Sequence, residues 1–170
     1  MLVVRAGKVA LVALLGVSVS TACAGSSPDD TGQRAASVYV EVVRWFADRS
    51  SDDPEPLPVF VEPRGEGASL PLDVQADVVN EMQDVAEVRF IDVRDEALTD
   101  DEDGHTVVVD DGVLIRLAPV VEEGDRVLLD VDVHEVDDQF TTMQFDIRRR
   151  SSGTGDEWRI SEAPVTVPPG

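Results

Sequence analysis

The sequence has little cysteine, lysine or aromatic side chain and no long apolar run, and these shortages exclude several classes of protein. One cysteine among 170 residues rules out an internal disulfide and any zinc or iron–sulfur site built from several cysteines. Lys and Arg number 14 against 35 Asp and Glu, so the net charge is −21 and the clustered cations that nucleic acid requires are lacking. No apolar run reaches the roughly 20 residues of a permanent membrane-spanning helix. With 42% hydrophobic residues, the chain still has a globular composition.

The first 23 residues carry the pattern of a secretory signal peptide. Arg5 and Lys8 form a basic start, an apolar run of 11 residues covers 9–19, and the small residues Ser-Thr-Ala precede Cys23. The apolar run is too short to cross a bilayer as a stable anchor. The pattern therefore predicts export, with removal of the segment.

The segment Ser20-Thr21-Ala22-Cys23 resembles the lipobox of bacterial lipoproteins. In that family the cysteine sulfur receives a diacylglyceryl group and the peptide is cut just before the cysteine. The resemblance therefore implies lipidation of Cys23 and removal of residues 1–22. Thr21 and Ala22 match the small-residue positions of the lipobox, whereas Ser20 stands where leucine is usual. An ordinary secretory cut after Ala22 or Ala24 stays open as the alternative.

The single cysteine favours lipidation over the ordinary cut. A free thiol on an exported protein can oxidise or cross-link, and acylation of Cys23 removes that hazard. Each buried methylene contributes about 0.8 kcal/mol, so two long acyl chains anchor a protein stably where one chain does so marginally. We therefore expect an extracytoplasmic protein held at the cell membrane by an N-terminal lipid.

The rest of the chain has the length of one domain. We assign residues 1–22 to the signal peptide, 23–32 to the lipidated cysteine and a flexible polar spacer, and 33–170 to a single domain. Removing the signal peptide removes two cations and no acids, which changes the net charge to −23. Such a domain is repelled by anionic membrane surfaces and attracts cationic ligands, divalent ions or basic protein partners.

Hydrophobic periodicity predicts two helices. Over residues 33–49 the helical spacing is kept by Val38, Val42, Trp45 and Phe46. A strand through 38–42 is the rival interpretation, because many of these residues are β-branched. A second amphipathic helix is predicted by the apolar face of Val74, Val78, Met82 and Val85.

Elsewhere the pattern predicts strands, over 57–62, 87–93, 107–109, 113–117, 126–136, 139–149 and 158–161, with an acidic loop at 94–104. Asp110-Asp111-Gly112 predicts a hairpin between 107–109 and 113–117. Helices ahead of consecutive strands indicate an α+β fold, with about two helices packed on one face of a mainly antiparallel sheet that ends in a C-terminal meander. The closing strands, 143–148 and 158–160, resemble the end of nuclear-transport-factor-2-like domains. The resemblance implies a similar fold there, and it does not identify any catalytic residue.

Asp130, Asp132 and His134 alternate along one predicted strand and share one face of it. Two carboxylates and an imidazole on one face can bind a divalent metal or perform acid–base chemistry. The alternative is a solvated sheet face opposite the helices, which the same alternation predicts without any ligand.

The acidic loop is the second candidate metal site. Asp101, Asp103 and Gly104 match positions of a calcium-binding loop, but Thr99 and Asp110 stand at its first and last ligand positions. A plain acidic loop is the alternative. We expect Trp45 and Trp158 to lie in or beside the core, and the arginines at 148–150 to pair with carboxylates.

The sequence contains no Gly-x-Ser-x-Gly elbow and no phosphate-binding glycine loop. We therefore expect a lipid-anchored binding or accessory domain that is not an enzyme, needs no cofactor and contacts the membrane only through its lipid. The first alternative is a small pocket enzyme or ligand binder that uses His134 and Asp132. The second is a divalent-cation-binding module, whose candidate ligands are Asp101, Asp103, Asp130, Asp132 and His134.

Overall fold

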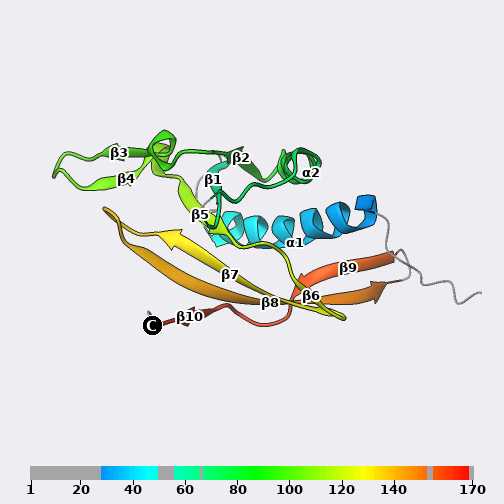
Figure 1. Cartoon of the computed structure of the whole chain (residues 1–170). Helices are drawn as coiled ribbons and strands as arrows, with labels where there is room; N and C mark the ends of the chain where they lie inside the picture. Colours follow the sequence, from blue (N-terminus) through cyan, green and yellow to red (C-terminus); the bar gives the residue numbers. More distant parts are fainter. Residues whose placement is uncertain (1–27, 50–55, 66, 153–154, 169–170) are drawn as a thin grey trace, which may run out of the picture.

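The structure is a computed structural model that describes residues 28–49, 56–65, 67–152 and 155–168, and every structural statement below concerns these residues. The expected signal peptide and Cys23 lie outside them. The elements follow one another as α1 (Pro28–Arg49), β1 (Leu57–Pro63), α2 (Leu72–Met82), β2 (Ala86–Phe90), η1 (Arg94–Glu96), β3 (Leu98–Asp100), β4 (Thr106–Val108), η2 (Val109–Asp111), β5 (Val113–Leu117), β6 (Glu122–Glu123), β7 (Arg126–His134), β8 (Phe140–Ser152), β9 (Gly155–Ile160) and β10 (Val165–Val167) (Figure 1).

Eight strands form the main sheet, in the order β10-β8-β7-β5-β1-β2, with β6 beside β7 and β9 beside β8. β1 runs parallel to both of its neighbours, β2 and β5. The other pairs of this sheet are antiparallel. Because parallel neighbours need a crossover, the chain passes through α2 between β1 and β2. The α+β class and the C-terminal meander are confirmed, and the parallel strands are a feature that the sequence pattern did not reveal.

Helix α1 lies inside the fold, between α2 on one side and strands β7 to β9 on the other (Figure 1). Its buried apolar residues cover about half of the helix circumference, and they are Ala36, Val38, Tyr39, Val40, Val42, Val43, Phe46 and Ala47. The remaining side carries exposed polar residues such as Gln33 and Ser37. A helix with so wide an apolar face is stable when that face is covered by the rest of the fold, and this explains the β-branched residues that made a strand seem possible.

The first helix begins at Pro28, five residues before the predicted start at Gln33. Residues 28–32, assigned to the spacer, therefore belong to α1, and this boundary was wrong. Proline is favoured in the first turn because its fixed φ suits a helix and its missing N–H is not needed there. Val74, Val78 and Met82 are buried on α2 as predicted. Val85 lies beyond the end of that helix and is 38% exposed.

The predicted hairpin between 107–109 and 113–117 is wrong. β4 pairs instead with β3 in a separate two-stranded sheet, so the segment 94–104 contains η1 and β3 rather than only a loop. Asp110 and Asp111 take positive φ and turn the chain, and β5 enters the main sheet between β1 and β7. Leu114 and Ile115 point to opposite faces of β5 and both are buried, which requires a central strand rather than a surface hairpin.

The sheet carries a core on each of its faces. The large core lies around α1 and includes Trp158, with Trp45 packed against its edge, as expected. The small core consists of Phe60, Ile91, Ala97 and Leu114, with Leu98 and Val108 of β3 and β4 packed against it. We call the first the inner face and the second the outer face.

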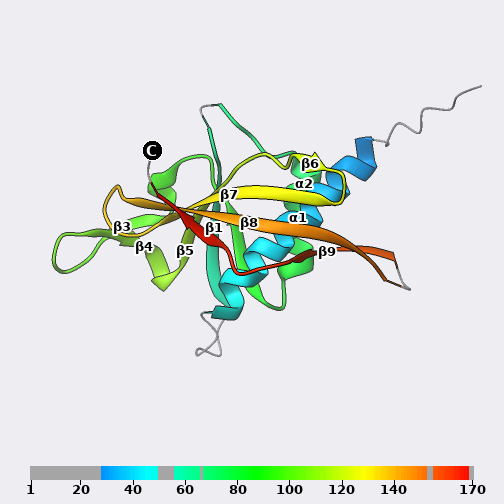
Figure 2. The same cartoon turned by 90° about the horizontal axis from the view of Figure 1, so that it is seen from below.

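The N-terminal helix and the β3–β4 hairpin mark opposite ends of the molecule in both views. The start of α1 lies at one end, and the β3–β4 hairpin lies at the opposite end (Figures 1 and 2). Among the described residues, no helix is long and apolar enough to cross a membrane.

Candidate functional site

Asp130, Asp132 and His134 project from the outer face of β7, as the alternation predicted. The intervening Val131 lies in the large core on the inner face. Asp132 and His134 are only 2% and 6% exposed, however, so the outer face is not the solvated surface that the alternative reading assumed. The small core covers part of this face, which strand alternation alone cannot reveal.

The Asp132 carboxylate is engaged through both of its oxygens. Oδ2 accepts a hydrogen bond from Arg116 Nη2 at 2.7 Å and lies 3.1 Å from Arg64 Nε. Oδ1 accepts a hydrogen bond from the Thr142 hydroxyl at 2.7 Å. We call Asp132, Arg64, Arg116 and Thr142 the Asp132 network. Its contacts connect β5, β7, β8 and the residue that directly follows β1 on the outer face.

Asp130 joins the same network at its solvent edge. Arg64 Nη1 lies 3.6 Å from Asp130 Oδ2, and the side-chain amide of Gln144 donates to Oδ1 at 3.0 Å. Arg64 therefore stands between the two carboxylates, where a metal ion would need to be. Within the described part of the chain, no group of three His, Cys, Asp or Glu residues is placed to hold a metal ion.

His134 is directed toward the β7–β8 turn rather than toward a carboxylate. Its Nε2 lies 2.6 Å from the backbone carbonyl oxygen of Asp137, to which the Nε2–H tautomer donates a hydrogen bond. The ring contacts Phe140 edge-on, with 5.4 Å between centroids. The guanidinium groups of Arg94 and Arg116 lie over the Phe140 ring, with their Cζ atoms 4.7 and 4.0 Å from its centroid. The structure thus brings His134 and Asp132 to one face but gives them separate partners.

Asp101 shapes the turn between β3 and β4. Its Oδ1 accepts the backbone N–H groups of Asp103 at 2.9 Å and His105 at 2.8 Å. These bonds, above all the one from His105, lower the pKa of the Asp101 carboxyl, because they favour its charged form. Asp103 is exposed, and it takes part in these bonds through its backbone N–H only. The Asp101 carboxylate therefore serves the loop's own backbone.

Asp137 joins the two hairpins of the outer face, a role that sequence reasoning missed. Its backbone N–H donates to the Thr106 carbonyl at 2.8 Å, and its Oδ1 accepts the Thr106 N–H at 3.0 Å. Its Oδ2 lies 3.5 Å from His105 Nδ1. These partners come from a different hairpin, so no local spacing indicated the contact; the only local signal was the Asp137-Asp138 pair at a predicted turn.

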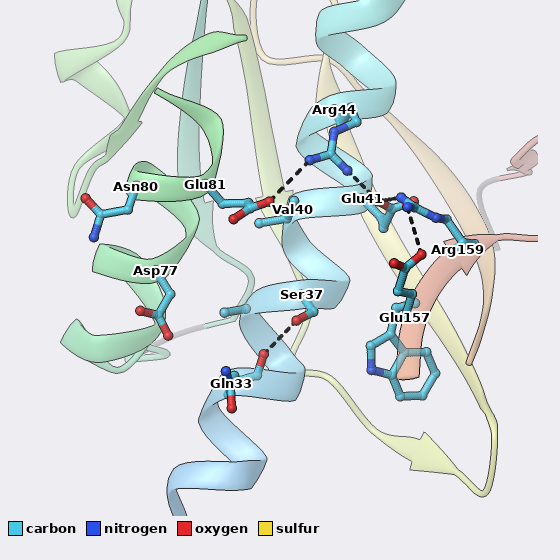
Figure 3. Close-up of a pocket in the computed structure, with 12 residues that line it drawn as sticks. Gln33, Ser37, Val40, Glu41, Arg44, Asp77, Asn80, Glu81, Glu157 and Arg159 are labelled. Atoms are coloured by element: carbon cyan, nitrogen blue, oxygen red, sulfur yellow. Dashed lines mark hydrogen bonds and ion pairs between the residues drawn. The ribbon is translucent and has the colours of Figure 1, made fainter. Parts of the chain in front are cut away.

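A charged groove of about 650 Å³ lies between α1, α2 and β9 (Figure 3). An alternating series of charges crosses it, Glu81–Arg44–Glu41–Arg159–Glu157, with the two Glu41 contacts at 2.7 Å each. Glu41 is the main cause of the raised pKa of Arg159, since its negative charge favours the protonated guanidinium. The groove's charges therefore hold the two helices and β9 together.

An apolar cleft of about 590 Å³ lies on the opposite flank of α1. Four parts of the chain form it, the first half of α1, residues 63 and 68–71, the start of α2 and residues 117–120. The residues that line it are Thr31, Gly32, Ala35, Tyr39, Pro63, Ala68, Ser69, Leu70, Pro71, Asp73, Val74, Leu117, Pro119 and Val120. Asp73 is the only charged residue among them.

Tyr39 forms part of the cleft wall and anchors it. Its hydroxyl donates to the Ala118 carbonyl at 3.1 Å, and burial raises the pKa of the phenol. Two large aliphatic side chains next to lining residues are strongly exposed, Leu72 at 82% and Val121 at 66%. Sequence reasoning missed the cleft because its residues come from segments that meet only in the fold.

No known family model, curated protein or solved structure matches this chain. The roles of its residues are therefore argued from their own geometry.

Proposed function

We propose that the protein is a lipid-anchored, extracytoplasmic binding or accessory domain without catalytic activity. The observation that carries this proposal is the position of the single cysteine, Cys23, directly after a basic start, an apolar run and small residues. Two acyl chains on its sulfur would hold the domain at the membrane surface.

The start of the described domain supports a short tether. Pro28, where α1 begins, is only five residues after Cys23. Five residues span at most about 18 Å, so a lipid on Cys23 keeps this end of the domain close to the bilayer. The opposite end, with the β3–β4 hairpin, then points away from the membrane (Figures 1 and 2).

The engagement of the candidate acid–base residues supports a non-catalytic role. A general acid or base needs a reachable group near its substrate. Both oxygens of Asp132 have arginine or threonine partners, and His134 contacts the Asp137 carbonyl. These bonds support a structural role for both residues on the outer face.

Two measurements test the anchor. Mass spectrometry of the mature protein should find an N-terminal cysteine that carries a diacylglyceryl group, and globomycin should make the precursor accumulate. Cys23→Ser should abolish both acylation and the globomycin effect. Ser20→Leu, which restores the usual lipobox residue, serves as the matched control and should keep both.

An unmodified N-terminus at Cys23 or Gly25 would contradict the anchor and support the ordinary secretory cut. Normal processing in globomycin-treated cells would contradict it equally.

A further inference from the structure

We propose that the apolar cleft beside α1 binds one acyl chain of a membrane glycerolipid. This inference rests on the proposed lipid anchor, which places the cleft next to a bilayer. Its volume of about 590 Å³ falls within the usual range for small-ligand sites, about 300–1,000 Å³.

The lining of the cleft fits an acyl chain. Most of its residues are apolar or small, and Tyr39, Leu117 and Val74 are buried in the adjoining core. Transfer of an alkyl chain from water to such a surface is favourable in proportion to the apolar area removed from water. Thr31, Ser69 and Asp73 supply hydrogen-bonding groups for a polar head.

The single charge in the lining selects among head groups. Asp73 carries a negative charge, and the chain around it is strongly acidic. A neutral, hydroxyl-bearing glycerol head can donate hydrogen bonds to a carboxylate, whereas an anionic head is repelled. The ligand class is therefore an acylglycerol rather than a free fatty acid.

The place of the cleft in the fold supports a membrane source. Thr31, which lines it, is eight residues after Cys23, and four of those residues already belong to α1. The cleft therefore lies at the tethered end of the domain. Leu72 and Val121 are exposed beside it and can enter the interfacial region of a bilayer, where apolar side chains are favoured. This contact adds to the lipid anchor, which was the only membrane contact expected from the sequence.

The lipid on Cys23 itself is a poorer occupant. Moving one of its two acyl chains into the cleft would leave the domain held by a single chain, which anchors only marginally. A separate lipid from the bilayer avoids this loss.

Two other cavities in the described part of the chain do not suit an acyl chain. The groove of Figure 3 is crossed by five paired charges. A third cavity, on the outer face, is lined by Arg94 and by four carboxylates, Glu62, Asp95, Asp100 and Asp138.

The test uses the Cys23→Ser form of the full chain, which carries no lipid of its own and needs no detergent. A monoacylglycerol with a fluorescent polyene chain is the probe, and monopalmitoylglycerol displaces it. We expect one saturable site per chain, and Ala35→Trp, which fills the cleft, should weaken displacement at least tenfold. Ala76→Trp, at an exposed position of α2 outside the cleft, is the matched control and should bind like the parent chain.

Two further variants keep the test decisive. If Ala35→Trp does not fold, Val120→Arg places a charge in the half-buried loop wall of the cleft and should also weaken binding tenfold. Asp73→Asn should raise affinity for palmitate several-fold, because it removes the repelling carboxylate. Equal binding by the parent chain and a folded cleft variant would overturn the proposal.

The membrane source is tested with phosphatidylcholine vesicles that contain fluorescent monoacylglycerol. Leu72→Ser with Val121→Ser should slow transfer to the protein several-fold, and Val165→Ser, an exposed valine on β10, is the control. If the lipidated chain fails to bind although the Cys23→Ser chain binds, the protein's own lipid occupies the cleft and the proposed source is wrong. Because the solution assay needs no anchor, its failure is separate from failure of acylation at Cys23.

Discussion

The two faces of the sheet are buried by different means. On the inner face, residues such as Leu129 and Phe145 pack against α1 in a continuous apolar core. On the outer face, Asp132 is almost as deeply buried, but its surroundings are arginine, threonine and the edge of a small core. The inner face is therefore stabilised by filled volume, and the outer face by paired polar groups around Asp132. The pairing on the outer face is incomplete, because Glu62 Oε2, Arg94 Nε, Arg116 Nε and His134 Nδ1 are buried without a hydrogen-bond partner.

The comparison shows what strand alternation can and cannot reveal. Consecutive residues of β7 point to opposite faces, as the period of two requires. That period assigns Asp132 to the face away from α1, but it does not say whether that face is open. The answer depends on β3, β4 and Arg64, which come from other parts of the chain.

The largest effect is expected on the inner face. Phe145→Ala removes a fully buried ring that contacts Trp45 and Phe46, and it should lower the free energy of unfolding by about 3–5 kcal/mol. Urea denaturation measures the loss, and Val165→Ala on an exposed strand is the control. A loss below about 1 kcal/mol would show that the inner core tolerates cavities and would break the comparison.

The next effect is expected in the Asp132 network. Asp132→Ala leaves the Arg116 guanidinium without its carboxylate and leaves Arg64 with Asp130 alone, which should cost about 1–3 kcal/mol because both arginines are largely covered. Asp132→Asn keeps the shape and one acceptor oxygen, so its loss should be smaller. The neighbouring Asp138 is exposed, and Asp138→Ala should change stability by less than about 0.5 kcal/mol.

A double-mutant cycle sharpens the same point. If Asp132 and Arg116 stabilise the outer face as a pair, the effects of Asp132→Ala and Arg116→Met will not add. Additive effects would mean that the two residues act independently.

A smaller and local effect is expected at Asp137. Asp137→Ala removes the acceptor for the Thr106 N–H and the partner of His105, so the β3–β4 hairpin should detach from the β7–β8 turn more often. Amide hydrogen exchange at Thr106 should accelerate, while exchange in β8 stays as in the parent. Asp137→Asn keeps the side-chain acceptor and should show less acceleration. Equal acceleration across all strands would indicate global rather than local loss.

The smallest effect is expected at Asp146, at the exposed edge of the outer face. Hydrogen bonds from Arg126 first and Arg148 second lower its pKa to about 2. A lowered pKa means that the pairing stabilises the fold above the unfolded value of about 3.9 and that this contribution disappears as the pH falls toward 2. Because the pair is close to solvent, Asp146→Asn should cost less than about 1 kcal/mol at pH 7.

Unfolding curves of the parent and Asp146→Asn should therefore converge between pH 4 and pH 2. A constant difference across that range would mean that the carboxylate acts through its shape rather than its charge.

Much of the fold was predictable because its signals are local. The apolar periods of α1 and α2 and the alternation of β7 and β8 are written in consecutive residues, and all four elements were expected. The hairpin predicted around Asp110 was wrong for a physical reason. The turn signal was real, since Asp110 and Asp111 take positive φ, but the partner of β5 is chosen by burial on both of its faces.

The candidate site was predictable only in part. Alternation correctly placed Asp130, Asp132 and His134 on one face, but their partners, Arg64, Arg116 and Asp137, come from other elements. Asp101 was named as a candidate metal ligand, with a plain acidic loop as the alternative, and in the structure its carboxylate accepts hydrogen bonds from its own loop. The apolar cleft had no local pattern at all.

The sequence by itself determined the features that depend on neighbours along the chain, namely the composition of the signal-like segment, the net charge, the two helices and the facing of each strand. The tertiary structure decided what depends on residues brought together from a distance. These features are the packing around α1, the parallel pairing of β1 with β2 and β5, and the formation of the cleft. The contacts of Arg64 and Arg116 with Asp132 on the outer face also belong here. Contact energies fall off within a few ångströms, so a pattern in sequence can state a residue's direction but not what it will touch.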